Sequence, residues 1–147
     1  MNIYFACSIT GGREFEAGYQ EIVAALTADG HEIPTSHLAQ SDVVENERKL
    51  TPQDVYERDV NWIKNCDVLI AEVSAPSHGV GYEIAFPGTA RQGRCALNVG
   101  KPVLCLHQKD RRVSKMITGN STPKLSIRAY ANIKEAISQA RFFLVNL

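Results

Sequence analysis

Apolar and polar positions follow one another along this chain in a pattern typical of a parallel α/β domain. Runs that are apolar at consecutive positions and rich in β-branched or aromatic residues predict strands covered on both faces. Five short segments have this character, the second and the last more weakly: residues 3–7, 31–33, 67–73, 103–106 and 125–130. Helical patterns lie between most of them. We therefore expect an α/β fold of the flavodoxin-like or Rossmann-like type, with a doubly wound five-stranded parallel sheet in one three-layer domain spanning 1–147.

The boundaries of three helices can be predicted. An apolar stripe at positions 15, 19, 22, 23 and 26 stops at Gly30, a residue typical of helix C-termini. Thr51, Pro52 and Asp54 form a typical N-terminus for a helix that runs to about Asn65. A last helix carries apolar residues at positions 133, 136, 137, 140, 143 and 144.

Composition and charge exclude several classes of protein. Sixteen Lys and Arg residues balance sixteen Asp and Glu residues, so no general attraction to a nucleic-acid polymer or an anionic membrane is available. Any anionic ligand must be held locally. The first residues lack the basic and apolar segments of a secretion signal, and no stretch approaches the roughly 20 apolar residues of a spanning helix. We expect a cytoplasmic protein with no membrane partner.

Cysteine and histidine spacing argues against disulfides and metal sites. The four cysteines are scattered without a CxxC pair, which favours buried or free thiols. The four histidines form neither an HExxH motif nor a pairing with cysteines, so we expect no metal.

Ligands of such sheets bind beyond the carboxyl ends of the strands, and the first strand ends in an unusual loop. Two hydroxyls and two glycines lead there into a helix start, where backbone N–H groups favour an anion such as phosphate. The alternative is a tight turn that needs glycine for its backbone angles. The loop matches neither a Walker motif nor GxGxxG. Its residues are Cys7, Ser8, Ile9, Thr10, Gly11, Gly12 and Arg13.

A second candidate loop follows the strand at 67–73. Ser77, Gly79 and the start of a short helix could form another anion cradle, and Glu83 lies about one turn into that helix. The neighbours of Glu83 are largely apolar, which should raise the pKa of its carboxyl unless something pairs with it. The alternative is a glutamate that complements the helix dipole.

Two more acids are candidates. Asp59 interrupts an apolar stripe on the helix over 52–65 and should face the sheet or its rim, where an ionised carboxylate is costly unless it is bonded or used. The alternative is an ion pair with a neighbour such as Arg58 or Lys64. Glu72, near the end of the strand before the second loop, could be a third functional acid or could simply orient that loop.

Two carboxylates near one strand-end cleft, with anion cradles on either side, favour cleavage of a glycosidic bond in a phosphorylated sugar. One acid would attack or stabilise the anomeric carbon, and the other would protonate the leaving group or handle water. Hydride and phosphoryl transfer lack their motifs here, and a serine hydrolase would need a GxSxG elbow, which is absent.

Longer segments carry a resemblance to a known family. The segments 4–14, 59–62, 67–73 and 76–83, continued by 100–106 and 112–117, resemble the 2′-deoxynucleoside 5′-phosphate N-hydrolases, relatives of the nucleoside 2-deoxyribosyltransferases. The likeness covers most of the chain in the right order. It implies a homodimer that hydrolyses a deoxynucleoside monophosphate to free base and 2-deoxyribose 5-phosphate without a cofactor.

The resemblance also implies roles for individual residues. Glu83 matches the nucleophile that forms a covalent sugar–enzyme intermediate, Asp59 matches the acid/base residue, and Tyr4 would position or activate Glu83. Ser8 and Ser77 match serines that hold the phosphate, with Gly79 allowing close approach of the backbone. Ser114 matches a serine that reaches the phosphate from the neighbouring subunit, and Met116 belongs to the same binding segment.

The chain departs from the family pattern at several positions. Cys7 stands where glycine is common and Thr10 where arginine is common, which leaves the substrate preference open. Residues 86–94 form an unusual insert, in which Pro87 and Gly88 interrupt an expected helix. The insert could cap the pocket, widen the dimer contact, or mark a variant that binds nucleotide but turns over slowly.

Two alternatives to the hydrolase follow: a nucleoside deoxyribosyltransferase and a non-catalytic nucleotide-binding module. Serines that converge on an anion favour an enzyme for phosphorylated substrates over a transferase of free nucleosides. Two acids beside a phosphate weaken its binding by like-charge repulsion, so their presence favours catalysis over binding alone. The preferred base and the choice between deoxyribose and ribose stay open, and a branch that cleaves cytidine monophosphate is close enough to be considered.

Overall fold

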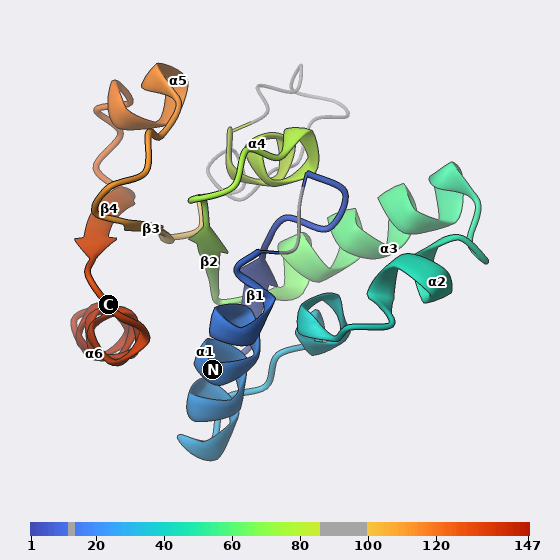
Figure 1. Ribbon diagram of the computed structural model, residues 1–147, viewed down its shortest axis with the longest axis horizontal. Coiled ribbons are helices and arrows are strands. Elements are labelled where there is room, and N and C mark those ends of the chain that lie inside the picture. Colours follow the sequence, from blue (N-terminus) through green and yellow to red (C-terminus); the bar gives the residue numbers. More distant parts are fainter. Residues whose placement is uncertain (12–13, 86–99) are drawn as a thin grey trace.

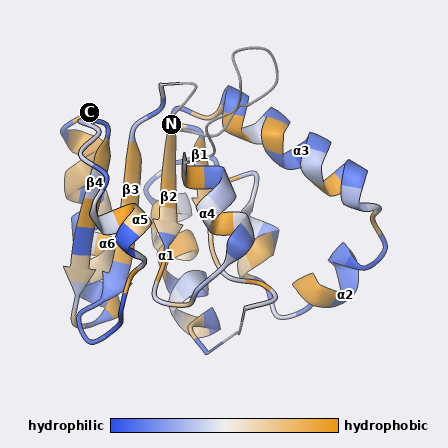
Figure 2. Ribbon diagram, turned by 90° about the horizontal axis from the view of Figure 1, so that it is seen from above, coloured by the Kyte–Doolittle hydropathy of each residue, from blue (hydrophilic) through white to orange (hydrophobic). Residues whose placement is uncertain are grey.

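Four parallel strands form the centre of the molecule. The computed structural model describes residues 1–11, 14–85 and 100–147. The strands are β1 (Ile3–Ala6), β2 (Val68–Glu72), β3 (Val103–Gln108) and β4 (Leu125–Tyr130), and they lie side by side in that order (Figure 1). Every residue of β1 and β2 is buried, including Glu72, the one acid in these two strands, and their apolar residues stand out in Figure 2.

Helices cover both faces of this sheet. Helices α1 and α6 pack below the sheet in the view of Figure 1, and α3 and α4 lie on the opposite side. The described helices are α1 (Glu16–Ala28), the 3₁₀ turn η1 (Ser36–Ala39), α2 (Val43–Glu47), α3 (Pro52–Asn65), α4 (His78–Ala85), α5 (Lys115–Thr118) and α6 (Ile133–Val145). The predicted α/β architecture with a parallel sheet between helical layers is confirmed.

The helix boundaries follow the sequence signals. Thr51 and Asp54 form a reciprocal capping box at the start of α3, with Pro52 as its first residue. At the end of α1, Gly30 adopts a φ of +85°, the left-handed conformation that favours glycine.

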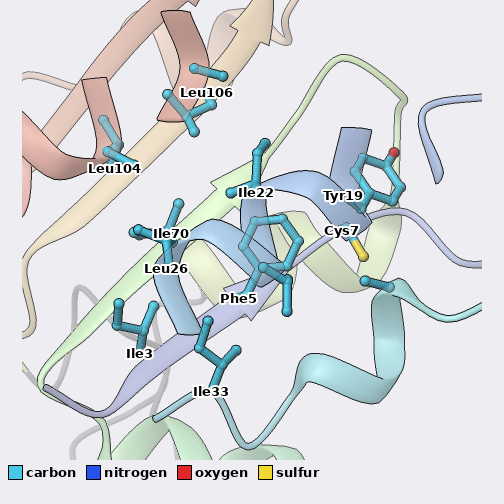
Figure 3. Packing of buried hydrophobic residues seen from close by; sticks show 14 of the residues in the cluster. Ile3, Phe5, Cys7, Tyr19, Ile22, Leu26, Ile33, Ile70, Leu104 and Leu106 are labelled. Carbon is cyan, nitrogen blue, oxygen red and sulfur yellow. The ribbon is translucent and has the colours of Figure 1, made fainter. Parts of the chain in front are cut away.

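The pleat of β1 sends alternate side chains into two separate cores. Ile3 and Phe5 point into the core beneath α1 and α6, which Figure 3 shows around Tyr19, Ile22 and Leu26. Tyr4 and Ala6 belong to the core on the opposite face, under α3 and α4. This alternation places the Tyr4 side chain on the face of the sheet that carries both candidate acids.

The predicted strand at 31–33 does not form as a full strand. Only one parallel bridge, between Asn2 and Glu32, forms beside β1, so the sheet has four strands rather than five in the part of the chain that the structure describes. Pro34 follows at once and has no N–H to donate. The Oγ1 of Thr35 then accepts a hydrogen bond of 2.9 Å from the Phe5 N–H, so a side chain takes the place of the main-chain acceptor.

Two other expectations concern membrane-spanning helices and the insert at residues 86–94. No helix within the described ranges is long and apolar enough to cross a membrane. Residues 86–94, the unusual insert, lie outside the described residues.

The Thr35 hydroxyl should contribute measurably to the free energy of unfolding. Thr35 is fully buried, so Thr35→Val keeps the shape but leaves the Phe5 N–H without its acceptor. We expect a loss of about 1–3 kcal/mol in the free energy of unfolding, measured by urea denaturation. Thr35→Ser, which keeps the hydroxyl, is the matched control, and equal stability of the two variants would contradict this role.

Candidate active site

Strand β1 and helices α3 and α4 bring Tyr4, Asp59 and Glu83 together on one face of the sheet. A pocket of about 160 Å³ opens between α3 and α4, with both acids in its wall. Tyr4 on β1 does not line the pocket, but its hydroxyl donates a hydrogen bond of 3.0 Å to Oε1 of Glu83. The remaining residues that line the pocket are Tyr56, Val60, Ile63, Gly79 and Tyr82. The pocket is therefore a largely apolar space with two carboxyl groups facing into it.

Tyr4 is a fixed donor in this arrangement. Its side chain is 1% exposed, and burial, followed by the negative charges of Glu83 and Asp59, raises the pKa of its hydroxyl far above the ordinary value. The hydroxyl thus keeps its proton throughout the physiological range. Because the bond engages Oε1 of Glu83, it orients the carboxyl group and directs the second oxygen elsewhere.

Glu83 shows the perturbation that the sequence predicts. Burial raises the pKa of its carboxyl to about 7, the charge of Asp59 adds to the increase, and the Tyr4 hydrogen bond and Arg58 partly oppose it. The alternative role, complementing the dipole of α4, does not fit the position. Glu83 is the sixth residue of a helix that begins at His78, beyond the first turn where that effect acts.

Asp59 fulfils both interpretations of its position. Nε of Arg58 donates a 2.8 Å hydrogen bond to Oδ1 of Asp59, so the ion pair considered as an alternative exists, with Arg58 and not with Lys64. Asp59 nevertheless lines the pocket. Burial raises the pKa of its carboxyl, and the bond and charge of Arg58 act against this. The apolar stripe around it is only partly buried, since Ile63 is enclosed and Tyr56 is 45% exposed.

A larger groove of about 1250 Å³ adjoins α4 and collects five of the predicted binding residues. Thr10 and Gly11 from the first loop, Ser77 from the second, and Ser114 and Met116 beside α5 all line it. Val80 and Gly81 of α4 face the groove, whereas Gly79, Tyr82 and Glu83 of the same helix line the pocket. Helix α4 therefore stands between the anion loops and the two acids.

The two loops touch at Gly11. A Cβ atom there would lie 2.2 Å from the carbonyl oxygen of Pro76 and 2.8 Å from Oγ of Ser8. Gly11 does not have a positive φ, so close packing and not a need for special backbone angles explains the glycine at this position. The Ser8 side chain is fully buried beneath this contact.

The other predicted binding residues take different places. Cys7 is buried, with its Sγ 3.5 Å from the carbonyl oxygen of Leu38, and Ile9 packs against the core under α1. Neither lines the pocket or the groove. Gly79 has room around it, since a Cβ atom would meet nothing closer than Oγ of Ser77 at 3.8 Å. Gly12 and Arg13 lie outside the described residues.

Glu72 takes the orienting role rather than a place in the site. Its carboxylate is 1% exposed and accepts hydrogen bonds from the Ser74 N–H and hydroxyl and, at 2.9 Å, from the Tyr130 hydroxyl. Oγ of Ser74 accepts in turn from the Gln108 N–H at 2.8 Å. The start of the second loop is thereby fastened to β3 and β4. Burial raises the pKa of this carboxyl.

Sequence reasoning missed the two tyrosines that border the pocket. Tyr56 and Tyr82 pack edge to face, with ring centroids 6.3 Å apart, and each is about 40% exposed. The signal was present, since Tyr82 precedes Glu83 and Tyr56 lies three residues before Asp59 on one helix face. Across residues 1–11, 14–85 and 100–147, no three His, Cys, Asp or Glu side chains gather in a way that could hold a metal ion.

Comparison with known proteins identifies the family. The family model of the nucleoside 2-deoxyribosyltransferases matches residues 3–127. A relative from Methanosarcina mazei, named as a proposed 2′-deoxynucleoside 5′-phosphate N-hydrolase, is 40% identical over 94% of this chain and 80% of its own length. A similarly named relative from Methanococcoides burtonii is 38% identical over 88% of this chain and 99% of its own. The chain belongs to the nucleoside 2-deoxyribosyltransferase family, as its motifs predict.

A further relative and a solved structure extend the comparison. The 5-hydroxymethyl-dUMP N-hydrolase of Rattus norvegicus is 41% identical over 80% of this chain and 69% of its own. The CMP N-glycosidase BcmB of Clostridium botulinum has the same fold, with a TM-score of 0.70, 19% identity, and coverage of 97% of this chain and 99% of that one.

Burial of Glu83 should make the stability of the protein depend on pH. The folded protein holds the Glu83 proton up to about pH 7, whereas the unfolded chain releases it near 4.5, so stability falls as pH rises through this window. Glu83→Gln removes the effect. We expect the variant to gain on the order of 2 kcal/mol over the native protein between pH 5 and pH 8, seen as a Tm difference that widens by several degrees in thermal unfolding. A Tm difference that is equal at both pH values would contradict the burial of this charge.

Proposed function

We propose that this protein hydrolyses the N-glycosidic bond of (deoxy)nucleoside 5′-monophosphates, releasing free base and (2-deoxy)ribose 5-phosphate. The observation that carries the proposal is that Asp59 and Glu83 line one apolar pocket, with the Tyr4 hydroxyl bonded to Glu83. The names of the relatives, which are N-hydrolases of nucleotides, support the same reaction class.

Glu83 acts as the nucleophile in the proposed mechanism. The carboxylate oxygen not engaged by Tyr4 attacks C1′ of the sugar, and the bond from C1′ to the base nitrogen breaks with its electron pair passing to the base. Asp59 gives its proton to the departing base. Asp59 then removes a proton from water, the water oxygen attacks C1′, and the ester bond to Glu83 breaks. One water is consumed, and both carboxyl groups return to their starting states.

The pocket suits this chemistry because it removes water from the nucleophile. A carboxylate in an apolar space loses the hydration that would otherwise blunt its attack, and the Tyr4 hydroxyl holds it in one orientation. The pKa of Glu83 at about 7 leaves a substantial fraction ionised at neutral pH.

The groove provides the proposed phosphate site. Hydroxyl groups of Ser77 and Ser114 and the start of α4 line it, and Gly79 leaves the backbone open to a ligand. Hydroxyl and backbone donors saturate one phosphate, which favours monophosphates over longer phosphate chains. Ser8 is the third proposed contact and would act from beneath Gly11.

We further propose a homodimer in which Ser114 serves the site of the neighbouring subunit. Ser114 lines the groove but not the pocket that contains Glu83, and it caps α5 by accepting a hydrogen bond from the Met116 N–H. The Met116 side chain beside it is 84% exposed, which suits a residue that packs against another subunit.

A deoxyribosyltransferase is the second candidate, favoured by the description of the family model. It would use the same nucleophile but pass the sugar to a second base rather than to water. Release of free base in the absence of an acceptor base separates the two reactions.

A product assay tests the proposed function. Each deoxyribonucleoside and ribonucleoside 5′-monophosphate, and each matching nucleoside, is incubated with the protein, and free base is measured by chromatography. We expect base from monophosphates alone, no turnover with Glu83→Ala, and a loss of at least 100-fold with Asp59→Asn, in line with the usual contribution of acid–base catalysis. Unchanged activity of Glu83→Ala would remove it as the nucleophile, and a loss below about tenfold in Asp59→Asn would reduce Asp59 to an orienting residue.

Subunit mixing tests the shared site. Dimers of Ser114→Ala alone and of Glu83→Ala alone should each be impaired, but a hybrid dimer contains one site with both native residues. An equal mixture that exchanges subunits should therefore regain roughly a quarter of the native activity. Labelled subunits that exchange without any recovery would contradict a composite site.

A further inference from the structure

Arg58 is held on three sides next to Asp59. Its Nε donates to Oδ1 of Asp59 at 2.8 Å, and its two terminal nitrogens donate to the two carboxylate oxygens of Glu47 at 2.8 and 3.2 Å. The guanidinium carbon lies 4.9 Å from the centroid of the Trp62 ring. A forked pair of hydrogen bonds combined with stacking on a ring is geometry that arginine supplies and lysine does not.

These contacts tie two parts of the chain together beside the pocket. Glu47 is the last residue of α2, whereas Arg58 and Trp62 lie one turn apart on α3. His37 in η1 adds to the link, since its Nε2 is 3.6 Å from Glu47 and its ring centroid is 5.6 Å from that of Trp62. We call this set, Glu47, Arg58 and Trp62, the guanidinium clamp.

Building on the proposed function, we propose that Arg58 is a positioning residue. Through the guanidinium clamp it fixes one oxygen of Asp59 and decides which of the two site carboxyls carries their shared proton. The clamp leaves the second oxygen of Asp59 to face the substrate. Arg58 itself touches no reacting atom in this proposal and acts only through Asp59.

The shared proton matters because the two acids need opposite states. Attack requires Glu83 as the anion, whereas departure of the base requires a proton on Asp59. Two interacting carboxyls titrate as a pair, and the one-proton form is divided between two arrangements. The guanidinium beside Asp59 favours the arrangement with the proton on Glu83. The productive arrangement is then the smaller population, but its Asp59 is a stronger acid towards the leaving base.

Other charged groups around Asp59 modify this balance without replacing Arg58. Glu47 and Glu83 favour a proton on Asp59 through their negative charge, and His37 opposes it when protonated. Tyr4 stays neutral because burial raises the pKa of its hydroxyl. Arg58 is the group that donates a hydrogen bond to Asp59.

The test measures kcat/KM for base release against pH in the native protein, Arg58→Gln and Arg58→Lys. In Arg58→Gln, the alkaline limb, where the pair of carboxyls loses its last proton, should move to higher pH, and kcat at the optimum should fall about tenfold because Asp59 is no longer held in place. Arg58→Lys keeps the positive charge, so its alkaline limb should return to the native position. Its kcat should stay low, because lysine cannot form the paired hydrogen bonds to Glu47. Lys64→Gln removes the same charge from an exposed position on α3 and should leave the profile unchanged. Coincident limbs in the native protein and Arg58→Gln would overturn the proposal.

A readout without turnover separates this proposal from the proposed function. The carboxyl carbon of Asp59, assigned by its loss in Asp59→Asn, is titrated by ¹³C NMR in the free protein. Its midpoint should rise in Arg58→Gln and stay in place in Lys64→Gln. If the native protein releases no base, the proposed function fails and the titration alone decides the role of Arg58. If base is released and the Asp59 midpoint does not move, only the role of Arg58 fails.

Discussion

The hydrogen bond from Tyr4 to Glu83 joins the inside of the sheet to the helix that borders the pocket. Tyr4 can donate it because the pleat of β1 turns alternate residues to opposite faces, and an odd shift in register would send the hydroxyl into the wrong core. The register that pairs Tyr4 with Leu69 therefore also fixes where Glu83 can sit. The fold and the site depend on the same alternation.

The partial burial of Asp59 and Glu83 makes their ionised forms costly, and neighbouring hydrogen-bond donors offset part of that cost. Two carboxyl groups near one apolar pocket repel each other when both are ionised, so at least one retains a proton at moderately acidic pH. Tyr4 stabilises the charge on Glu83, and the guanidinium clamp stabilises the charge on Asp59. Glu72 is more deeply buried than either of them, and Ser74 and Tyr130 donate hydrogen bonds to its carboxyl group. Burial raises the pKa of all three acids, and they differ in the hydrogen-bond partners that oppose the increase.

The sequence predicted those features that local patterns or family motifs determine. Uninterrupted apolar runs indicated the buried strands, the capping residues indicated the start of α3, and an acid among apolar residues pointed to Glu83. Features that depend on tertiary contacts were missed or predicted only in part. Residues 31–33 have the composition of a strand, but Pro34 and the Thr35 side chain end the pairing after one bridge. Neighbouring residues on a helix do not normally face each other, so the sequence could not favour Arg58 over Lys64 as the partner of Asp59. The contact forms because Glu47, on another helix, holds the Arg58 guanidinium.

We propose that Glu83 attacks the sugar and carries it covalently between the two halves of the reaction. The most direct measurement mixes the protein with excess deoxynucleoside monophosphate, quenches in acid at millisecond intervals, and analyses the digested peptides by mass spectrometry. The account predicts a deoxyribose 5-phosphate adduct on Glu83 that forms as base appears and decays as product accumulates. Full release of base with the Glu83 peptide unmodified at every interval, or an adduct on Asp59 instead, would contradict it.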